Sequence, residues 1–165
     1  MSASNLPETS SILWLHDGRA LGYAEVGKSD GFPIFYFHGY DSSRLEVLLW
    51  REWAVTLGVR MIALDRPGIG RSDLKAGFRL LDWPDDVVEV ANHLGIERFA
   101  VAAASGGGAY GLHVPTKSRA GSRPVASSAR SLQVTSSRKT HACGCGECGG
   151  WVSIFPGSIV SLYTP

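Results

Sequence analysis

The sequence predicts an α/β fold in which helices cover both faces of a mostly parallel sheet. Two observations carry this prediction: runs of β-forming residues alternate with segments of helical periodicity, and loops rich in Gly or Pro separate them. The chain has 165 residues, of which 44% are hydrophobic and 19% are charged. That size and composition are typical of one soluble globular domain with a real hydrophobic core.

The chain changes character near residue 112. Residues 1–112 contain 10 basic and 14 acidic residues, whereas residues 113–165 contain 6 basic residues and one acid, Glu147. The net charges of the two parts are therefore −4 and +5, and all three cysteines lie in the second part. Ser, Arg, Gly and Ala dominate that part without a recurring apolar period, a composition typical of disorder. We predict a flexible N-terminus at residues 1–11 and a partial folded domain at residues 12–112. Residues 113–165 are predicted to form a disordered, low-complexity basic tail.

Residues 11–27 are expected to form a β-hairpin. Two apolar runs flank Asp17-Gly18, and an Asp-Gly pair between such runs is typical of a type I′ turn, in which both central residues have positive φ. The next apolar run, at residues 34–37, is continuous and rich in β-formers, as in a strand buried on both faces. This strand is expected to stop at His38-Gly39.

Residues 45–57 have the pattern of a helix. Ser42 or Ser43 is placed to cap its first turn, and Gly58 follows where a helix commonly ends. Residues 59–64 then form a second continuous apolar run, which predicts another buried strand.

Asp65 follows this second strand and precedes the loop RPGIGRSD, which is too rich in Gly and Pro for either regular structure. A carboxylate at the start of such a loop can accept hydrogen bonds from the N–H groups of the loop. We therefore interpret Asp65 as the residue that holds the loop, not as a catalytic carboxylate.

Residues 82–95 carry the clearest helical pattern. Asp82 is placed to accept hydrogen bonds from the first-turn N–H groups, and Pro84 suits the first turn. One apolar face recurs at helical spacing and contains Val87, Val90, Ala91 and Leu94. A strand at residues 98–103 then leads to Ser105. Because the carboxyl ends of parallel strands meet at one edge of a sheet, function is expected there.

The segment AVAAASGGGAYG allows two interpretations. In the first, Gly106, Gly108 and Gly111 form the G-x-G-x-x-G loop that binds the phosphates of a dinucleotide. That loop should follow the first strand of a βαβ unit and have an acid about 20 residues later. Here it follows a late strand, and residues 125–135 contain no acid. The context therefore argues against a phosphate loop.

In the second interpretation, Ser105 is a nucleophile on a sharp turn between a strand and a helix. Such a turn needs small residues two positions before and after the nucleophile, and Ala103 and Gly107 are small. The N–H of Gly106, at the start of the next helix, could bind a developing oxyanion. A second donor is expected from the loop after the first buried strand, where Gly39 would let the N–H of Tyr40 face Ser105.

Four segments in this order, FHGYDSSRLE, DRPGIGRSD, WPDDVVEVANHLGIERF and AAASGGGAYGL, resemble the α/β-hydrolase fold family, in its small esterase-like and epoxide-hydrolase-like members. The resemblance covers about residues 15–112. It implies an N-terminal half of a hydrolase core, with Ser105 as nucleophile and the backbone N–H groups of Tyr40 and Gly106 as oxyanion hole. His38 and Gly39 then belong to the oxyanion loop, and the substrate is a small molecule with an ester or related acyl bond.

The family also implies an acid and then a histidine after the nucleophile. The only acid after Ser105 is Glu147, no histidine follows it, and His113 and His141 both precede it. The triad cannot be assembled in the family order, so we expect this chain to be inactive as it stands. We interpret the sequence after residue 112 as foreign to the family, the product of a frameshift, a retained intron or a gene-model error. One sheet edge would then be open, and stability marginal.

A non-catalytic interaction protein is the alternative function. His141, Cys143, Cys145 and Cys148 form H-x-C-x-C-x-x-C, a spacing compatible with zinc, although zinc sites commonly draw on two separated ligand pairs. We expect no metal site and no cofactor. Six basic residues spread over the tail make a poor nucleic-acid site, and no segment has the length of a membrane span. The start, MSASNLPETSS, has neither the basic nor the apolar region of a secretory signal. A cytoplasmic location is expected, and the sequence leaves the oligomeric state open.

Overall fold

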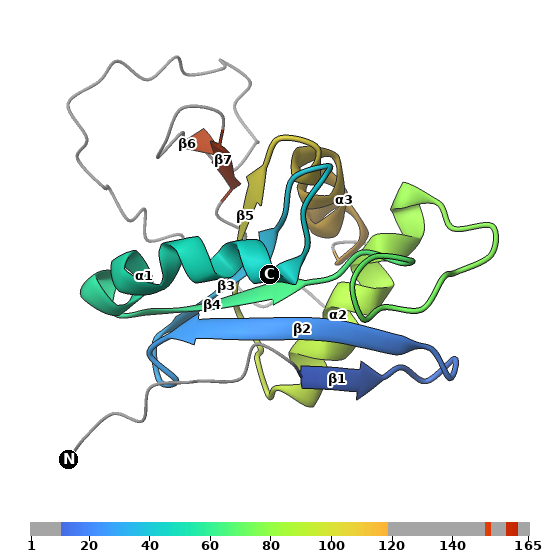
Figure 1. Ribbon diagram of the computed structural model, residues 1–165, viewed down its shortest axis with the longest axis horizontal. Coiled ribbons are helices and arrows are strands. Elements are labelled where there is room, and N and C mark those ends of the chain that lie inside the picture. Colours follow the sequence, from blue (N-terminus) through green and yellow to red (C-terminus); the bar gives the residue numbers. More distant parts are fainter. Residues whose placement is uncertain (1–10, 119–150, 153–157, 162–165) are drawn as a thin grey trace.

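The computed structural model describes residues 11–118, 151–152 and 158–161 (Figure 1). In chain order the elements are β1 (Ser11–Trp14), β2 (Ala20–Gly27), β3 (Phe32–Phe37), the 3₁₀ helix η1 (Arg44–Trp50), α1 (Arg51–Leu57), β4 (Val59–Leu64), the 3₁₀ helix η2 (Leu80–Asp82), α2 (Trp83–His93), β5 (Ala100–Ala104), α3 (Gly107–Ser118), β6 (Trp151–Val152) and β7 (Ser158–Ser161).

The strands form one sheet in the order β1-β2-β4-β3-β5-β7-β6, with β1 at one side and β6 at the other (Figure 1). The central strands β4, β3 and β5 are parallel, whereas β1 pairs antiparallel with β2, and β2 with β4. On the other side β7 pairs antiparallel with β5, and β6 with β7. The predicted α/β class is confirmed, with parallel strands at the centre and antiparallel pairs towards both edges.

Two hydrophobic cores lie on the two faces of the sheet. One packs α2 and the start of α3 against the strands, through buried residues that include Trp83, Val87, Val90 and Val114. The other packs η1 and α1 against the opposite face, through Val47 and Ala54. The helical periodicity of residues 82–95 therefore does reflect a buried face. Helices cover both faces of the sheet, as the sequence predicts.

The hairpin between β1 and β2 has a different turn from the predicted type I′. Gly18 has φ 83°, but Asp17 is not among the residues of positive φ. The N–H of Leu15 donates to the carbonyl of Arg19 and that of Gly18 donates back to Leu15, both at 2.8 Å. This is the three-residue loop in which a single left-handed glycine makes a bulge. The type I′ prediction is wrong because only one position needs positive φ here.

The predicted helix at residues 45–57 has two parts, η1 followed by α1. Of the two serines considered as its cap, Ser43 takes the role, with its side chain accepting from the N–H of Leu45 at 3.3 Å. Asp82 does not cap α2 through its side chain. Its carboxylate instead accepts from the N–H of Arg79 at 3.0 Å and from the guanidinium at 2.9 Å, because η2 precedes the helix. The predicted cap at Asp82 is therefore wrong.

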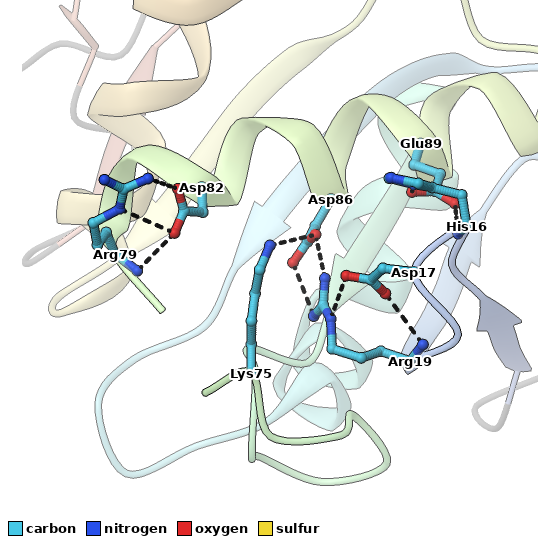
Figure 2. Close-up of polar contacts among 8 residues, drawn as sticks. All are labelled: His16, Asp17, Arg19, Lys75, Arg79, Asp82, Asp86 and Glu89. Atoms are coloured by element: carbon cyan, nitrogen blue, oxygen red, sulfur yellow. Dashed lines mark hydrogen bonds and ion pairs between the residues drawn. The ribbon is translucent and has the colours of Figure 1, made fainter. Parts of the chain in front are cut away.

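Polar contacts attach the hairpin loop to α2 (Figure 2). The guanidinium of Arg19 lies 2.7 Å from Asp86, which also lies 3.7 Å from Lys75. The ring of His16 lies 2.6 Å from the carboxylate of Glu89, and its backbone N–H donates to the same group. One helix thus anchors both the hairpin and the loop after β4.

The predicted boundary at residue 112 falls inside α3, which extends to Ser118. Within the predicted tail the structure also describes β6 and β7, and β7 lies beside β5 with Ala104 opposite Ser158. Of the predicted flexible residues 1–11, Ser11 begins β1, whereas residues 1–10 and the Cys/His segment at 141–148 lie outside the described residues. No helix in the described part of the chain is long and apolar enough to span a membrane.

Candidate active site

The candidate site lies where the three central parallel strands end. His38 follows β3, Asp65 follows β4 and Ser105 follows β5. These strands are neighbours and parallel, so their carboxyl ends meet at the same edge of the sheet. The structure thus brings together the three segments that the sequence marks.

Ser105 occupies the turn between β5 and α3 with an unusual backbone conformation. Its φ is 44°, and it is the only non-glycine residue of positive φ in the described ranges. A serine in this region is strained, and such strain is concentrated at functional sites. The carbonyl of Ser105 accepts a hydrogen bond from the N–H of Gly108 at 3.0 Å, in the first turn of α3. Ser105 itself is exposed. The turn therefore presents the hydroxyl at the surface of the sheet edge.

The turn is tight because α3 begins directly against the end of β3. A Cβ added at Gly107 would lie 2.2 Å from the carbonyl oxygen of Phe37, so no side chain fits there. Ala103, two residues before Ser105, is buried in the core that α3 covers. Position 107 thus requires glycine, and position 103 holds a small buried residue, which is the pattern that an elbow of this kind needs.

The loop at Gly39 and Tyr40 lies against Ser105 and Gly106. A Cβ added at Gly39 would be 3.9 Å from the Cβ of Ser105, and one added at Gly106 would be 3.4 Å from the backbone N of Tyr40. Among the described residues no hydrogen bond occupies the N–H of Tyr40 or that of Gly106. Two backbone N–H groups without a partner in the described part of the chain therefore lie close to the exposed Ser105.

Glu46, in η1, holds this loop from one side. One of its carboxylate oxygens accepts from the N–H of Gly39 at 2.9 Å, and the other accepts from the hydroxyl of Tyr36 at 2.7 Å. Burial, together with this hydrogen bond, raises the pKa of Tyr36 far above its usual value, so the hydroxyl remains a donor. Sequence reasoning missed Glu46, because nothing in a helical pattern shows which polar side chain turns back to the preceding strand.

His38 is fully buried beneath the same loop. Its Nδ1 lies 2.9 Å from the carbonyl oxygen of Gly39, and its Nε2 has no partner among the described atoms. Burial lowers the pKa of His38, and the nearby guanidinium of Arg66 adds to this effect, against the opposing hydrogen bond to Gly39. The ring is therefore neutral at pH 7, with Nδ1 as donor to Gly39.

Asp65 anchors the loop that follows β4. Its buried carboxylate accepts from the N–H of Arg44 at 2.7 Å, from the Arg44 guanidinium at 2.6 Å and from the N–H of Arg71 at 2.9 Å. Its carbonyl accepts from the hydroxyl of Ser72, whose oxygen accepts from the N–H of Gly22. With its oxygens occupied in this way, Asp65 serves the architecture of the loop.

The structure does not complete a catalytic triad within the residues it describes. No acid or histidine there is hydrogen-bonded to Ser105, His113 lies half-buried in α3, and His141 and Glu147 fall outside the described ranges. In the same ranges no group of three or more His, Cys, Asp or Glu side chains could hold a metal ion. What the geometry offers is a hydroxyl and two N–H donors.

Comparison with known proteins places this arrangement in context. No established family profile matches the chain. Over 96 residues, 58% of the chain, it is 34% identical to the uncharacterized hydrolase YcgS of Bacillus subtilis. Over 99 residues, 59% of the chain, it is 36% identical to the dihydrolipoyllysine-residue acetyltransferase component of the acetoin cleaving system of Pseudomonas putida. The chain spans 33% and 26% of these two relatives.

Solved structures give the same result for the fold. A carboxylesterase from Nitrososphaera gargenis matches 64% of the chain with a TM-score of 0.57 and 19% identity, over 40% of its own length. The esterase of Exiguobacterium antarcticum matches 65% of the chain with a TM-score of 0.54 and 23% identity, over 40% of its own length. An epoxide hydrolase of Vigna radiata also matches 65% of the chain, with a TM-score of 0.54 and 18% identity, over 35% of its own length. The resemblance seen in the four sequence motifs is thus confirmed, and the chain has, over its described central strands and helices, the fold of the α/β-hydrolase family.

Proposed function

We propose that Ser105 is the nucleophile of an esterase-like site and that the backbone N–H groups of Tyr40 and Gly106 are its oxyanion hole. One observation carries the proposal: an exposed serine of φ 44° stands between a buried strand and a helix, against two N–H groups without a partner among the described residues. The names of the matched esterases support a small-molecule ester as the substrate class.

The chemistry follows from these groups. The oxygen of Ser105 attacks the acyl carbon, and the carbonyl oxygen of the ester becomes an oxyanion that the two N–H groups stabilise. The Ser105 proton passes to hydroxide or water, and the tetrahedral intermediate expels the alkoxide, which takes up a proton from solvent and leaves as the alcohol. Water then hydrolyses the acyl-serine to the acid and restores the hydroxyl. Each donor to the oxyanion is worth roughly 3–4 kcal/mol of transition-state stabilisation in known serine hydrolases.

Proton transfer is the step that this chain serves poorly. A serine hydroxyl reacts slowly unless a base accepts its proton, and no Asp follows Asp86 in the sequence. We therefore propose that the chain as it stands forms a covalent adduct on Ser105 but turns over ester substrates slowly or not at all. The adduct should form faster as the pH rises, since hydroxide then takes the place of the base that the described residues do not place beside Ser105.

Covalent labelling tests the proposal without requiring turnover. The full chain is treated with an alkyl fluorophosphonate between pH 7 and pH 9, and the modified residue is located by peptide mass spectrometry. We expect the label on Ser105, no label at that peptide in Ser105→Ala, and an unchanged rate in Ser42→Ala. Ser42 is a matched control because it lies in the neighbouring loop, where its backbone N–H and not its hydroxyl makes the recorded hydrogen bond.

Turnover of p-nitrophenyl acetate separates labelling from catalysis. We expect one equivalent of p-nitrophenol per chain, followed by a rate close to the uncatalysed background. Sustained turnover lost in Ser105→Ala would show that the chain assembles a base of its own. A folded chain with no label on Ser105 would contradict the proposal and favour a non-catalytic role.

A further inference from the structure

We propose that Arg66 is a positioning residue for the oxyanion hole: its buried guanidinium fixes and polarises the Gly39–Tyr40 peptide so that the N–H of Tyr40 faces Ser105. The inference rests on the proposed function above, and it assigns a role to a side chain that the sequence motifs leave unexplained. Arg66 is the second residue of the loop after β4, and it is only 6% exposed.

The hydrogen bonds of Arg66 converge on one short stretch of backbone. Its Nη2 lies 2.8 Å from the carbonyl oxygen of Gly39 and 3.0 Å from that of Tyr40. No cis peptide bond occurs in the described residues. The carbonyl of Gly39 and the N–H of Tyr40 belong to the same trans peptide, so they point in opposite directions. A guanidinium that holds the carbonyl on one side therefore aims the N–H to the other.

Ser105 and Gly106 lie close to the peptide that Arg66 holds. A Cβ added at Gly106 would approach the backbone N of Tyr40 to 3.4 Å, and Ser105 borders Gly39. The N–H of Tyr40 has no hydrogen-bond partner in the described ranges, although both flanking carbonyls are bound. The fold thus leaves this N–H open while it fixes the peptide that carries it.

Three donors act on the Gly39 carbonyl. Besides Arg66, the Nδ1 of His38 lies 2.9 Å from it and the N–H of Ser42 lies 3.3 Å from it. Hydrogen bonds to a carbonyl draw electron density from its peptide and make the N–H of that peptide a stronger donor. The effect is largest for the donor that carries a full charge, which is Arg66.

Arg66 also differs from the other buried arginine in what compensates its charge. Arg44 forms a 2.6 Å ion pair with Asp65, whereas no carboxylate lies within ion-pair distance of Arg66 among the described residues. Its neighbours are the two carbonyls, the Nδ1 of the neutral His38 ring at 3.3 Å and the ring of Tyr110, whose centroid is 5.1 Å from the guanidinium carbon. A buried cation without a counter-ion is costly. We read its position as a source of positive potential beneath a site where an oxyanion forms.

The test measures the peptide and the reaction separately, in the full chain. Arg66→Met removes the charge and the hydrogen bonds, Arg66→Lys keeps the charge but not the fork, and Arg60→Met is the control. Arg60 is a matched control because it is a partly buried arginine on β4 that pairs with Glu25, at 2.5 Å, at the opposite end of the strand from the site. The readouts are the NMR shifts of the Gly39 carbonyl carbon and the Tyr40 amide nitrogen, and the rate at which a fluorophosphonate labels Ser105.

In Arg66→Met we expect the Gly39 carbonyl resonance to move upfield and labelling of Ser105 to slow about tenfold or more, since a misdirected donor costs much of its contribution. Arg66→Lys should change the Gly39 carbonyl shift and the labelling rate in the same directions but by less. Arg60→Met should change neither the shift nor the rate. If Arg66→Met fails to fold, the comparison of Arg66→Lys with Arg60→Met decides.

Two results would overturn the inference: an unmoved Gly39 carbonyl in a folded Arg66 variant, or a labelling rate equal to that of Arg60→Met. A third result is that Ser105 is not labelled in the wild-type chain, while the Gly39 carbonyl resonance still moves in Arg66→Met. This would contradict the proposed function but support the contact between Arg66 and the Gly39 carbonyl. The two failures are therefore distinguishable.

Discussion

Gly107 meets the carbonyl oxygen of Phe37 so closely that a Cβ at position 107 would lie 2.2 Å from that oxygen. The contact joins the end of β3 to the start of α3, and it determines how near the Gly39–Tyr40 loop can come to Ser105. Both partners of the clash are backbone atoms or their direct substituents. Relief would therefore require the strand and the helix to separate.

Gly107→Ala should lower the free energy of unfolding by about 1–3 kcal/mol, because the added methyl group overpacks a site that cannot relax. Gly108→Ala is its control, since a Cβ there would meet nothing within 4 Å. In a helix, that exchange should stabilise by roughly 0.5–1 kcal/mol. Urea denaturation followed by circular dichroism measures the free energy of unfolding of both variants. An equal change in the two variants would contradict the steric role of Gly107.

Removing the charge of Asp65 should destabilise the protein by about 3–5 kcal/mol, because the guanidinium of Arg44 is then buried without its partner. The variant is Asp65→Asn, which keeps the shape of the side chain. Asp30→Asn, at an exposed turn position, is the control and should be close to neutral. Thermal unfolding of the two variants checks the prediction, and a near-neutral Asp65→Asn would show that the loop does not depend on this carboxylate.

The pair between His16 and Glu89 should be visible in an NMR titration (Figure 2). The hydrogen bond and charge of Glu89 raise the pKa of His16 above its ordinary 6.5. The contribution of the pair to stability is therefore fully present below pH 6.5 and is lost as the pH rises through the raised pKa. In Glu89→Gln the pKa of His16 should return towards 6.5, whereas Glu97→Gln, at an exposed position after the end of α2, should leave it raised.

His38 should have the opposite pH dependence. Burial lowers its pKa below 6.5, so the unfolded chain binds a proton that the folded chain excludes. The contribution of His38 to the free energy of unfolding should therefore be constant above pH 6.5. It should fall as the pH drops from 6.5 towards the lowered pKa. His38→Asn, which keeps a donor near the Gly39 carbonyl, should reduce the loss of stability between pH 7.5 and pH 5. If the variant loses as much stability as the wild-type chain between pH 7.5 and pH 5, groups other than His38 cause the acid sensitivity.

The strands and the site edge could be predicted because they depend on local patterns. Continuous apolar runs end at His38, Asp65 and Ser105, and the structure places all three at the carboxyl edge of the parallel strands. The amphipathic period of α2 likewise predicts which of its faces is buried. These are properties of single segments, and a single sequence contains them.

The errors concern local turn geometry, and the omissions concern contacts between segments. Asp82 turns to Arg79 instead of capping α2, because a 3₁₀ turn precedes the helix. Glu46 and Arg66 bind the Gly39–Tyr40 loop from elements that are distant from one another along the chain. Neither side chain differs, in its local sequence, from an ordinary surface charge. Only the packing of β3, β4 and η1 shows that they hold the two peptides on either side of Gly39.

The most direct measurement of the central claim is a crystal structure of the full chain after reaction with a fluorophosphonate. The account predicts phosphorus bonded to the oxygen of Ser105, with the phosphonyl oxygen about 2.7–3.1 Å from the backbone nitrogens of both Tyr40 and Gly106. An adduct on another residue, or a phosphonyl oxygen turned away from those two nitrogens, would contradict it.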